Sequence, residues 1–253
     1  MVKERVQAET ASAERPIYEL KEVVKTRASE GYSFRLRVPS LRISPGEKIA
    51  LIGESGCGKS TLLDMLAFVL QPTSSEHFEF NAGGGEHDIA RAWKRRRQNR
   101  LAALRRRHLG YVMQTGGLLP YLTVRENINL SRRILGMKDD GTVEALAKEL
   151  GLHRHLEKRP ADLSTGERQR VAIGRALAHR PSIVIADEPT ASVDPFAAER
   201  IMALFMEMVE ERNITVIVAS HAWRHIKQLG LRRLAHHTRR SKDGQMAETV
   251  VSG

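Results

Sequence analysis

The sequence predicts an α/β fold built on a mostly parallel sheet, and three observations support that prediction. Two continuous apolar runs, residues 183–186 and 215–219, have the composition of strands that are covered on both faces. Helical stretches precede both runs, so helices and strands alternate along the chain. A third apolar run, residues 48–52, leads into a glycine-rich turn, which indicates a buried strand that ends in a loop.

Length, composition and charge limit the possible classes of protein. The 253 residues suit one α/β domain, or one domain with an inserted lobe, and a hydrophobic fraction of 41% is enough for a sizeable core. There is no apolar run of about 18 residues and no signal-peptide pattern, so we expect a cytoplasmic protein. The single cysteine excludes an internal disulfide, and the net charge of +11 favours anionic partners of a kind that charge alone cannot identify.

The first half of the chain begins with a predicted flexible tail, residues 1–15. Alternating apolar residues between 16 and 52 predict half-buried strands. Apolar residues after the glycine-rich turn predict a helix, at Leu62, Leu63, Leu66 and Leu70. The Ser-, Gly- and Glu-rich segment 74–88 predicts a hairpin and loop, and the strongly basic segment 91–108 is predicted to be helical.

The remaining elements are predicted from shorter signals. Residues 111–113 indicate a short strand, and residues 115–163 are predicted to be loops and helices, with one helix at 144–150. The apolar runs 183–186 and 215–219 complete the parallel sheet.

The turn after residue 52 fits the pattern G-x-x-x-x-G-K-[ST] in full, and it lies between a predicted strand and a predicted helix. Glycines allow the backbone to wrap around phosphates, and the helix directs its positive end at the same anion. Lys59 is expected to reach the β- and γ-phosphates, and Ser60 to bind Mg²⁺. The predicted binding residues are Gly53, Glu54, Ser55, Gly56, Cys57, Gly58, Lys59, Ser60 and Thr61.

Cys57 lies inside this loop, where a small filler residue is the simplest interpretation. A thiol beside a helix N-terminus is often reactive. We therefore expect a thiol alkylator to inactivate the protein and MgATP to protect it.

The apolar run 183–186 is followed directly by two carboxylates. Asp187 is predicted to hold Mg²⁺ directly or through water, because this hard cation prefers oxygen ligands. Glu188 is then placed to accept a proton from the attacking water. An acidic cap at the end of a buried strand is the alternative interpretation of the same pair.

Further motifs identify a family. Residues 163–177, Leu-Ser-Thr-Gly-Glu-Arg-Gln-Arg-Val-Ala-Ile-Gly-Arg-Ala-Leu, closely resemble the ABC signature, usually written LSGGQ, and its following helix. Residues 191–194 resemble the D-loop, His221 matches the switch histidine and Gln114 matches the Q-loop glutamine. This resemblance to ABC ATPases covers about residues 16–244. It implies a P-loop NTPase (RecA-like) core, an antiparallel β subdomain and an inserted helical subdomain at about residues 115–165, within a nucleotide-binding domain of residues 16–253.

The resemblance also implies roles for single residues. ATP and Mg²⁺ are the expected cofactors, with Lys59, Glu188 and His221 in catalysis and with Ser60, Gln114 and Asp187 at the metal. Two copies are expected to dimerise head to tail, so that the signature of one chain meets the ATP held by the other. The residues that face that ATP are predicted to be Ser164, Gly166 and Glu167, and Asp194 is predicted to link the two protomers, although it could also cap the next helix.

Two positions depart from the family pattern. Thr165 replaces the usual first glycine of the signature, and a β-branched residue resists positive φ. The loop must therefore be extended or helical there, or be strained, which could slow hydrolysis. The adenine-stacking aromatic is not evident: its place falls near Thr26 or Arg27, and either Arg27 or Tyr32 is a candidate.

Within the family, the segment 110–128 and the sequence from Glu167 to Ile173 are most similar to the lipoprotein-releasing and macrolide-exporting groups. The expected partner is a separate inner-membrane permease, which would place the protein on the cytoplasmic face of that membrane. Mechanical work such as lipoprotein release, or secretion-system regulation, is the implied function. A soluble ABC ATPase that acts on nucleic acid or ribosomes is the alternative, and an ATP-binding scaffold with poor turnover is a third interpretation.

The basic segment 91–107 has three interpretations: a solvated helix face, a contact for anionic lipid headgroups, or a nucleic-acid surface. Its cations are Arg91, Lys94, Arg95, Arg96, Arg97, Arg100, Arg105, Arg106 and Arg107. Because only Trp93 interleaves with them, a platform for single-stranded nucleic acid is disfavoured.

Overall fold

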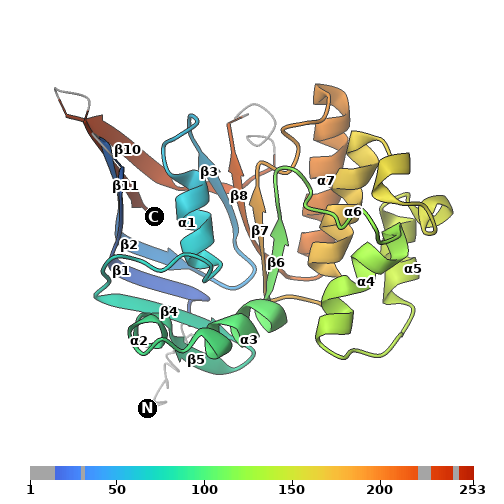
Figure 1. Ribbon diagram of the computed structural model, residues 1–253, viewed down its shortest axis with the longest axis horizontal. Helices are drawn as coiled ribbons and strands as arrows, with labels where there is room; N and C mark the ends of the chain where they lie inside the picture. Colours follow the sequence, from blue (N-terminus) through green and yellow to red (C-terminus); the bar gives the residue numbers. More distant parts are fainter. Residues whose placement is uncertain (1–14, 30–31, 222–228, 242–244) are drawn as a thin grey trace, which may run out of the picture.

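The computed structural model describes residues 15–29, 32–221, 229–241 and 245–253, and it has two sheets with helix α1 between them (Figure 1). The predicted tail therefore lies outside the described residues except for Arg15, whose guanidinium pairs with the Glu86 carboxylate. Within the described ranges, no helix is both long enough and apolar enough to cross a membrane.

The larger sheet, called the outer sheet here, has six strands in the order β10-β11-β2-β1-β4-β5. Its strands are β1 (Tyr18–Ser29), β2 (Tyr32–Ile43), β4 (His77–Ala82), β5 (Gly85–Asp88), β10 (Ala235–Arg240) and β11 (Met246–Ser252). All neighbours pair antiparallel except β11 and β2, which are parallel. The strands predicted from alternating apolar residues and the predicted hairpin at 74–88 both belong to this sheet.

The second sheet, called the core sheet, has five strands in the order β6-β7-β8-β3-β9, and all its neighbours are parallel. Its strands are β3 (Lys48–Ile52), β6 (Leu109–Val112), β7 (Ile183–Asp187), β8 (Thr215–Ser220) and β9 (Arg232–Arg233). The three apolar runs predicted as buried strands form β3, β7 and β8. Because parallel strands end at a common edge, the loops that follow these strands converge there.

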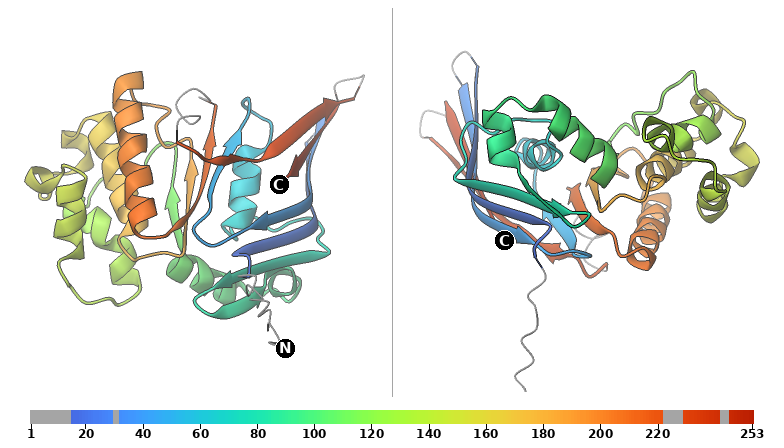
Figure 2. Two further views of the ribbon diagram at one scale, coloured as in Figure 1. Left: turned by 180° about the vertical axis from the view of Figure 1, so that it is seen from behind. Right: turned by 90° about the horizontal axis from the view of Figure 1, so that it is seen from below.

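Helix α1 packs between the sheets, whereas α6 and α7 cover the other face of the core sheet (Figures 1 and 2). The helices are α1 (Lys59–Leu66), α2 (Ile89–Lys94), α3 (Gln98–His108), α4 (Val124–Ile134), α5 (Thr142–Glu149), α6 (Thr165–Leu177) and α7 (Pro195–Glu211), with short 3₁₀ turns at His153–His155 and Pro160–Asp162. The predicted helix at 144–150 is α5. The basic segment is helical, as predicted, and it forms two helices because Arg96 has a φ of 53° that ends α2.

Two apolar clusters hold these layers together. The first joins the outer sheet to α1, where the Tyr18 hydroxyl donates to the Leu66 carbonyl at 2.7 Å. The second cluster packs the helices α4, α5, α6 and α7 against the core sheet. Gly174 of α6 permits this packing, since a Cβ there would lie 2.9 Å from Leu150 and 3.3 Å from Ile128. The helix that carries the signature is thereby fixed to the core.

Candidate nucleotide site

The glycine-rich loop runs from β3 into α1, as predicted. Gly56 and Gly58 have φ of 82° and 95°, a left-handed conformation that favours glycine. Gly58 caps α1 without a side-chain hydrogen bond, so the first N–H groups of the helix remain available to an anion. The Lys59 ammonium donates to the carbonyl oxygens of Gly53 (2.7 Å) and Glu54 (3.0 Å), which holds its side chain across the loop.

Glu188 follows β7 with a φ of 47°, which is uncommon for a residue with a side chain. Its N–H donates to the Ala219 carbonyl at 2.9 Å, which ties it to β8. One carboxylate oxygen lies 3.5 Å from the Lys59 ammonium, and the other lies 2.9 Å from Nδ1 of His221. Strained backbone of this kind concentrates at functional sites. Here it places a carboxylate between a lysine and a histidine.

These groups line a single cleft of about 1010 Å³, whose walls come from both sheets. A cleft of this size suits a nucleotide. The predicted site residues that line it are Glu54, Ser55, Gly56, Gly58, Lys59, Ser60, Thr61, Gln114, Asp187, Glu188 and His221. Gly53 and Cys57 do not line it, and a Cβ on Gly53 would meet the Cys57 Sγ behind the loop.

The same cleft contains a donor set that fits magnesium. The side chains of Ser60, Asp187 and Gln114 come from the loop, the end of β7 and the segment after β6. All three offer oxygen ligands, which is the preference of Mg²⁺ in phosphate sites. Their role at the metal stays a prediction, and the chemistry of the donors agrees with it.

The wall opposite the loop belongs to the outer sheet and contains Arg27, Ala28, Tyr32 and Phe34. Both candidates for the adenine contact, Arg27 and Tyr32, therefore lie on the cleft, whereas Thr26 is not among its lining residues. Tyr32 is 46% exposed, so its ring is free to stack on a base.

Two residues beneath the cleft were not predicted from sequence. The Tyr111 hydroxyl of β6 donates to the Asp64 carboxylate of α1 at 3.3 Å. Burial raises the pKa of Asp64, with a further contribution from the Asp187 charge. Burial and the Asp64 and Asp187 charges also raise the pKa of Tyr111. Asp64 follows Ser60 by four residues on α1, and that helical spacing was the available signal.

The signature lies at the N-terminus of α6, and none of its residues lines the cleft. The Ser164 Oγ accepts the Glu167 N–H at 3.3 Å, and the Glu167 carboxylate accepts the Ser164 N–H at 2.7 Å, which forms a capping box. The hydrogen bonds from Ser164 lower the pKa of Glu167, and His155 adds to this effect. Thr165 is the first helical residue and has no positive φ, so the glycine replacement leaves the backbone unstrained.

The predicted D-loop aspartate also begins a helix. The Asp194 carboxylate accepts the Ala197 N–H at 3.0 Å, and Pro195 occupies the first position of α7. Capping by Asp194 is thereby confirmed, and its predicted role between two protomers stays a prediction.

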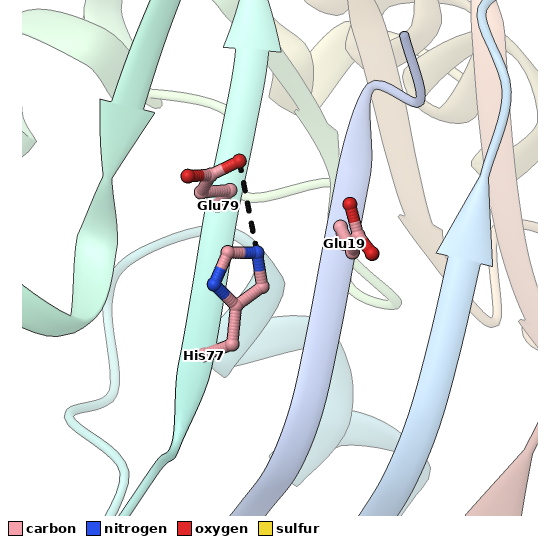
Figure 3. A group of neighbouring side chains, drawn as sticks. All are labelled: Glu19, His77 and Glu79. Atoms are coloured by element: carbon pink, nitrogen blue, oxygen red, sulfur yellow. Dashed lines mark ion pairs between the residues drawn. The ribbon is translucent and has the colours of Figure 1, made fainter. Parts of the chain in front are cut away.

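A second group of potential metal ligands lies on the outer sheet, away from the cleft (Figure 3). Glu19 and Glu79 are direct cross-strand partners, and His77 lies two residues before Glu79. The ligand atoms of these three residues lie within 4.8 Å of one another. His77 is 3.6 Å from the Glu79 carboxylate, and the Lys21 ammonium is 3.8 Å from that of Glu19. Each carboxylate thus has a neighbouring basic side chain, the Lys21 ammonium beside Glu19 and the His77 imidazole beside Glu79.

Known proteins with similar sequences show the family to which the chain is related. The ABC transporter family model matches residues 36–191. The lipoprotein-releasing system ATP-binding protein LolD of Novosphingobium aromaticivorans is 39% identical over 211 residues, which cover 81% of this chain and 90% of that protein. The macrolide export ATP-binding/permease protein MacB of Syntrophobacter fumaroxidans is 38% identical over 211 residues, 81% of this chain, but the match spans only 28% of MacB.

A solved structure is similar over most of the chain. The ATP-binding cassette MJ0796, determined as a dimer in a post-hydrolysis state bound to ADP and Pi, superimposes with a TM-score of 0.72 at 31% identity. The alignment covers 86% of this chain and 93% of that one. The family match extends over more than half of the sequence, and the chain belongs to the ABC transporter family.

Proposed function

We propose that this ABC ATPase hydrolyses ATP in the cleft described above, with Glu188 as the base that receives the proton of the attacking water. The observation that carries the proposal is the position of the Glu188 carboxylate, 3.5 Å from Lys59 and 2.9 Å from His221 in the cleft that the phosphate loop forms. A general base needs to be within hydrogen-bond reach of its water, and a carboxylate that faces the γ-phosphate end of the loop meets that condition.

The ion pair between Lys59 and Glu188 suggests how binding prepares the base. Lys59 is 95% buried at its side chain and has three acceptors, the Gly53 and Glu54 carbonyls and the Glu188 carboxylate. When ATP arrives, its phosphates compete for the same ammonium. The Glu188 carboxylate then loses its cation and becomes available to water, with His221 still at 2.9 Å to orient it. Ser60, Gln114 and Asp187 would hold a magnesium ion, which would neutralise phosphate charge.

The functional unit in this proposal is a head-to-tail homodimer. The signature residues Ser164, Gly166 and Glu167 lie outside the cleft of their own chain, at a helix N-terminus suited to an anion. A second copy brings that helix end to the γ-phosphate. Solved MJ0796 cassettes are dimers, which supports this arrangement.

The proposed partner of the homodimer is a separate permease of the inner membrane. Met113 and Tyr121, on either side of the Q-loop glutamine Gln114 and the loop that follows it, are 48% and 67% exposed. Exposed apolar side chains beside a residue of the nucleotide cleft suit a protein contact that senses the nucleotide. The relatives LolD and MacB, named for lipoprotein release and macrolide export, support mechanical work on that membrane. Regulation of a secretion system is a further form of the same activity.

Two measurements test the proposed contact with the permease. The chain should copurify with the membrane protein encoded by a neighbouring reading frame, and that protein should raise its ATPase rate. Charged substitutions Met113→Glu and Tyr121→Glu should abolish copurification while they leave the basal ATPase rate intact. Stable copurification of both variants would place the contact elsewhere.

Anionic lipid headgroups are the second proposed contact. Arg91, Arg95, Arg97 and Arg100 line a small cavity of about 340 Å³ at the junction of α2 and α3, together with Glu86 and Asp88. Glu86 is neutralised by Arg15, and the Asp88 carboxylate caps α2 through the Arg91 N–H. The cavity is therefore net positive. Figure 2 (right) places α2, α3 and α4 along one edge of the molecule, which α7 does not share.

Vesicle flotation tests the lipid contact. The triple change Arg95→Glu, Arg97→Glu and Arg100→Glu should abolish flotation with anionic vesicles, since each cation near such a surface contributes about 1 kcal/mol. The matched control is Arg239→Glu with Arg240→Glu, two exposed arginines of β10. Equal loss in both variants would indicate a general charge effect. Binding of nucleic acid without binding of vesicles would instead favour the nucleic-acid alternative.

A further inference from the structure

Two side chains of the outer sheet contact the phosphate loop, at its first and last glycines. A Cβ added to Gly58 would lie 2.7 Å from Cζ of Phe34, which belongs to β2. A Cβ added to Gly53 would lie 2.7 Å from Nε2 and 2.9 Å from Cε1 of His236, which belongs to β10. The Cys57 Sγ is also 2.7 Å from that Gly53 position. The loop is thus packed against two strands of the outer sheet that lie far apart in the sequence.

His236 is the one residue of β10 whose side chain is not exposed, and among the strands of the described residues β10 pairs with β11 alone. Its cross-strand partner is Val251, which is 2% exposed, so this pair points toward the interior. His237 points the opposite way because successive residues of a strand alternate between faces. Among the described residues, Nδ1 of His236 is buried without a hydrogen-bond partner. Packing against the loop is therefore the main interaction of this imidazole.

The contact between His236 and Gly53 lies next to the backbone carbonyl groups that hold Lys59. The Gly53 and Glu54 carbonyls accept hydrogen bonds from the Lys59 ammonium at 2.7 and 3.0 Å. A shift of Gly53 would move both acceptors, and the lysine with them. The pKa of His236 is lowered by burial, by the nearby Arg233 and Lys59 charges and by the adjacent His237. The lowered pKa favours the neutral imidazole, so this side chain adds no further positive charge beside Lys59.

We propose that His236 is a positioning residue for the phosphate loop, which it holds in the conformation that binds ATP by filling the space behind Gly53. It does not touch the nucleotide and acts through Gly53, Cys57 and Lys59. Through it the C-terminal hairpin of β10 and β11 becomes part of the nucleotide site. The inference rests on the proposed role of this loop as the ATP phosphate site, so its tests include one that needs no nucleotide.

The first test measures the rate at which a maleimide alkylates Cys57, the only cysteine, in the absence of nucleotide. Because the imidazole and the thiol share the space behind Gly53, His236→Ala should raise that rate several-fold. His237→Ala is the matched control and should alkylate at the wild-type rate. Equal rates for His236→Ala and wild type would overturn the packing on which the proposal depends, whether or not the loop binds ATP.

The second test separates positioning from general stability. His236→Ala should raise the KM for ATP about tenfold and change kcat less than about twofold, because displacement of a binding loop weakens its contacts with the ligand. His236→Gln, which keeps a polar group near the Nε2 position, should recover most of the affinity. An unchanged KM in His236→Ala, or a fall of kcat that matches a fall of Tm in all variants, would overturn the proposal. Failure of the wild-type chain to bind ATP would instead remove the proposed function.

The third test is a compensation experiment. Gly53 has no positive φ, so alanine is compatible with its backbone, and the three atoms nearest to a Cβ there all belong to the Cys57 and His236 side chains. Gly53→Ala should therefore abolish ATP binding. The combination of Gly53→Ala with Cys57→Ala and His236→Ala should restore a measurable part of it. If Gly53→Ala binds ATP normally, the space behind Gly53 is not filled as we infer.

Discussion

The phosphate-loop cleft and the signature turn are the two halves of the proposed catalytic site, and they differ in how complete they are within one chain. The cleft gathers Lys59, Asp187, Glu188 and His221 from separate elements. The signature turn satisfies its own groups instead, because Ser164 and Glu167 cap each other.

This difference indicates separate roles for the cleft and for the signature at the start of α6. In the cleft, the Glu188 backbone is strained, and the Lys59 ammonium is held by two backbone carbonyls. We infer that this arrangement is built for a nucleotide. Backbone strain of that kind marks a functional centre. The signature turn is an unstrained helix end that would be stable without any ligand. We infer that the second half is preformed and is brought to the first by association of two chains.

The largest effect is expected from Glu188→Gln, which tests the cleft half alone. The amide keeps the shape of the side chain but cannot accept the proton, so kcat should fall by about 10²-fold or more. ATP should still bind, and the dimer should persist with ATP, as measured by light scattering. Steady-state ATPase assays give the rate. Equal rates for wild type and Glu188→Gln would remove Glu188 as the base.

The next largest effect is expected in a complementation experiment, which tests directly whether the catalytic site is shared between two chains. Gly166→Asp introduces a carboxylate where a partner's phosphate is expected, yet a Cβ at Gly166 meets only ordinary contacts at 3.6 Å or more, and Asp suits a helix N-terminus. Gly166→Asp and Lys59→Ala should each be inactive as homodimers. Mixed in equal amounts, they should regain up to about a quarter of the wild-type rate, because half of the dimers then contain one intact composite site.

The complementation experiment has a clear contrary result. If mixing restores no activity although both variants fold with the wild-type circular dichroism spectrum, the signature acts within its own chain. The cleft and the signature would then not be halves of a shared site.

The sequence predicted some residues around the cleft and missed others, for a physical reason. The loop 53–61 and the carboxylates after β7 were predicted because each chemistry depends on residues adjacent in the chain. Tyr111 and His236 were missed because β6 carries Tyr111 to α1, and β10 carries His236 to the loop, only after the sheets have formed. The break between α2 and α3 was also missed, since the positive φ falls on Arg96 and not on a glycine.

A smaller effect is expected at the far end of the signature helix. His179 follows α6, is 3% exposed, and donates from Nε2 to the Leu109 carbonyl at 3.1 Å. Burial lowers the pKa of His179 to about 4. The unfolded chain therefore takes up this proton first as the pH falls below about 6.5, and stability declines by at most about 1.4 kcal/mol per pH unit until about pH 4.

His179→Gln tests this effect, because its amide can donate to the same carbonyl and does not titrate. Urea unfolding at pH 7, 6 and 5 should show a shallower loss of stability in the variant. Hydrogen exchange should show that the difference in amide protection between the variant and the wild type lies in α6 and not in α1. An identical pH slope would mean that the anchoring of the signature half does not depend on His179.

The smallest effect is expected from Thr165→Gly, which restores the residue usual in the family. The Thr165 backbone is already helical, and its hydroxyl accepts a hydrogen bond from Arg168 at 2.9 Å. Glycine relieves no strain there and costs the helix up to about 1 kcal/mol. We therefore expect kcat to change by less than about threefold, with a slightly lower Tm. Thr165→Ser, which keeps the hydroxyl, should match wild type in both. A tenfold rise of kcat in the glycine variant would show that the threonine methyl obstructs the partner's phosphate. The signature half would then be preformed in backbone only, and its fit to the cleft would be limited by this one side chain.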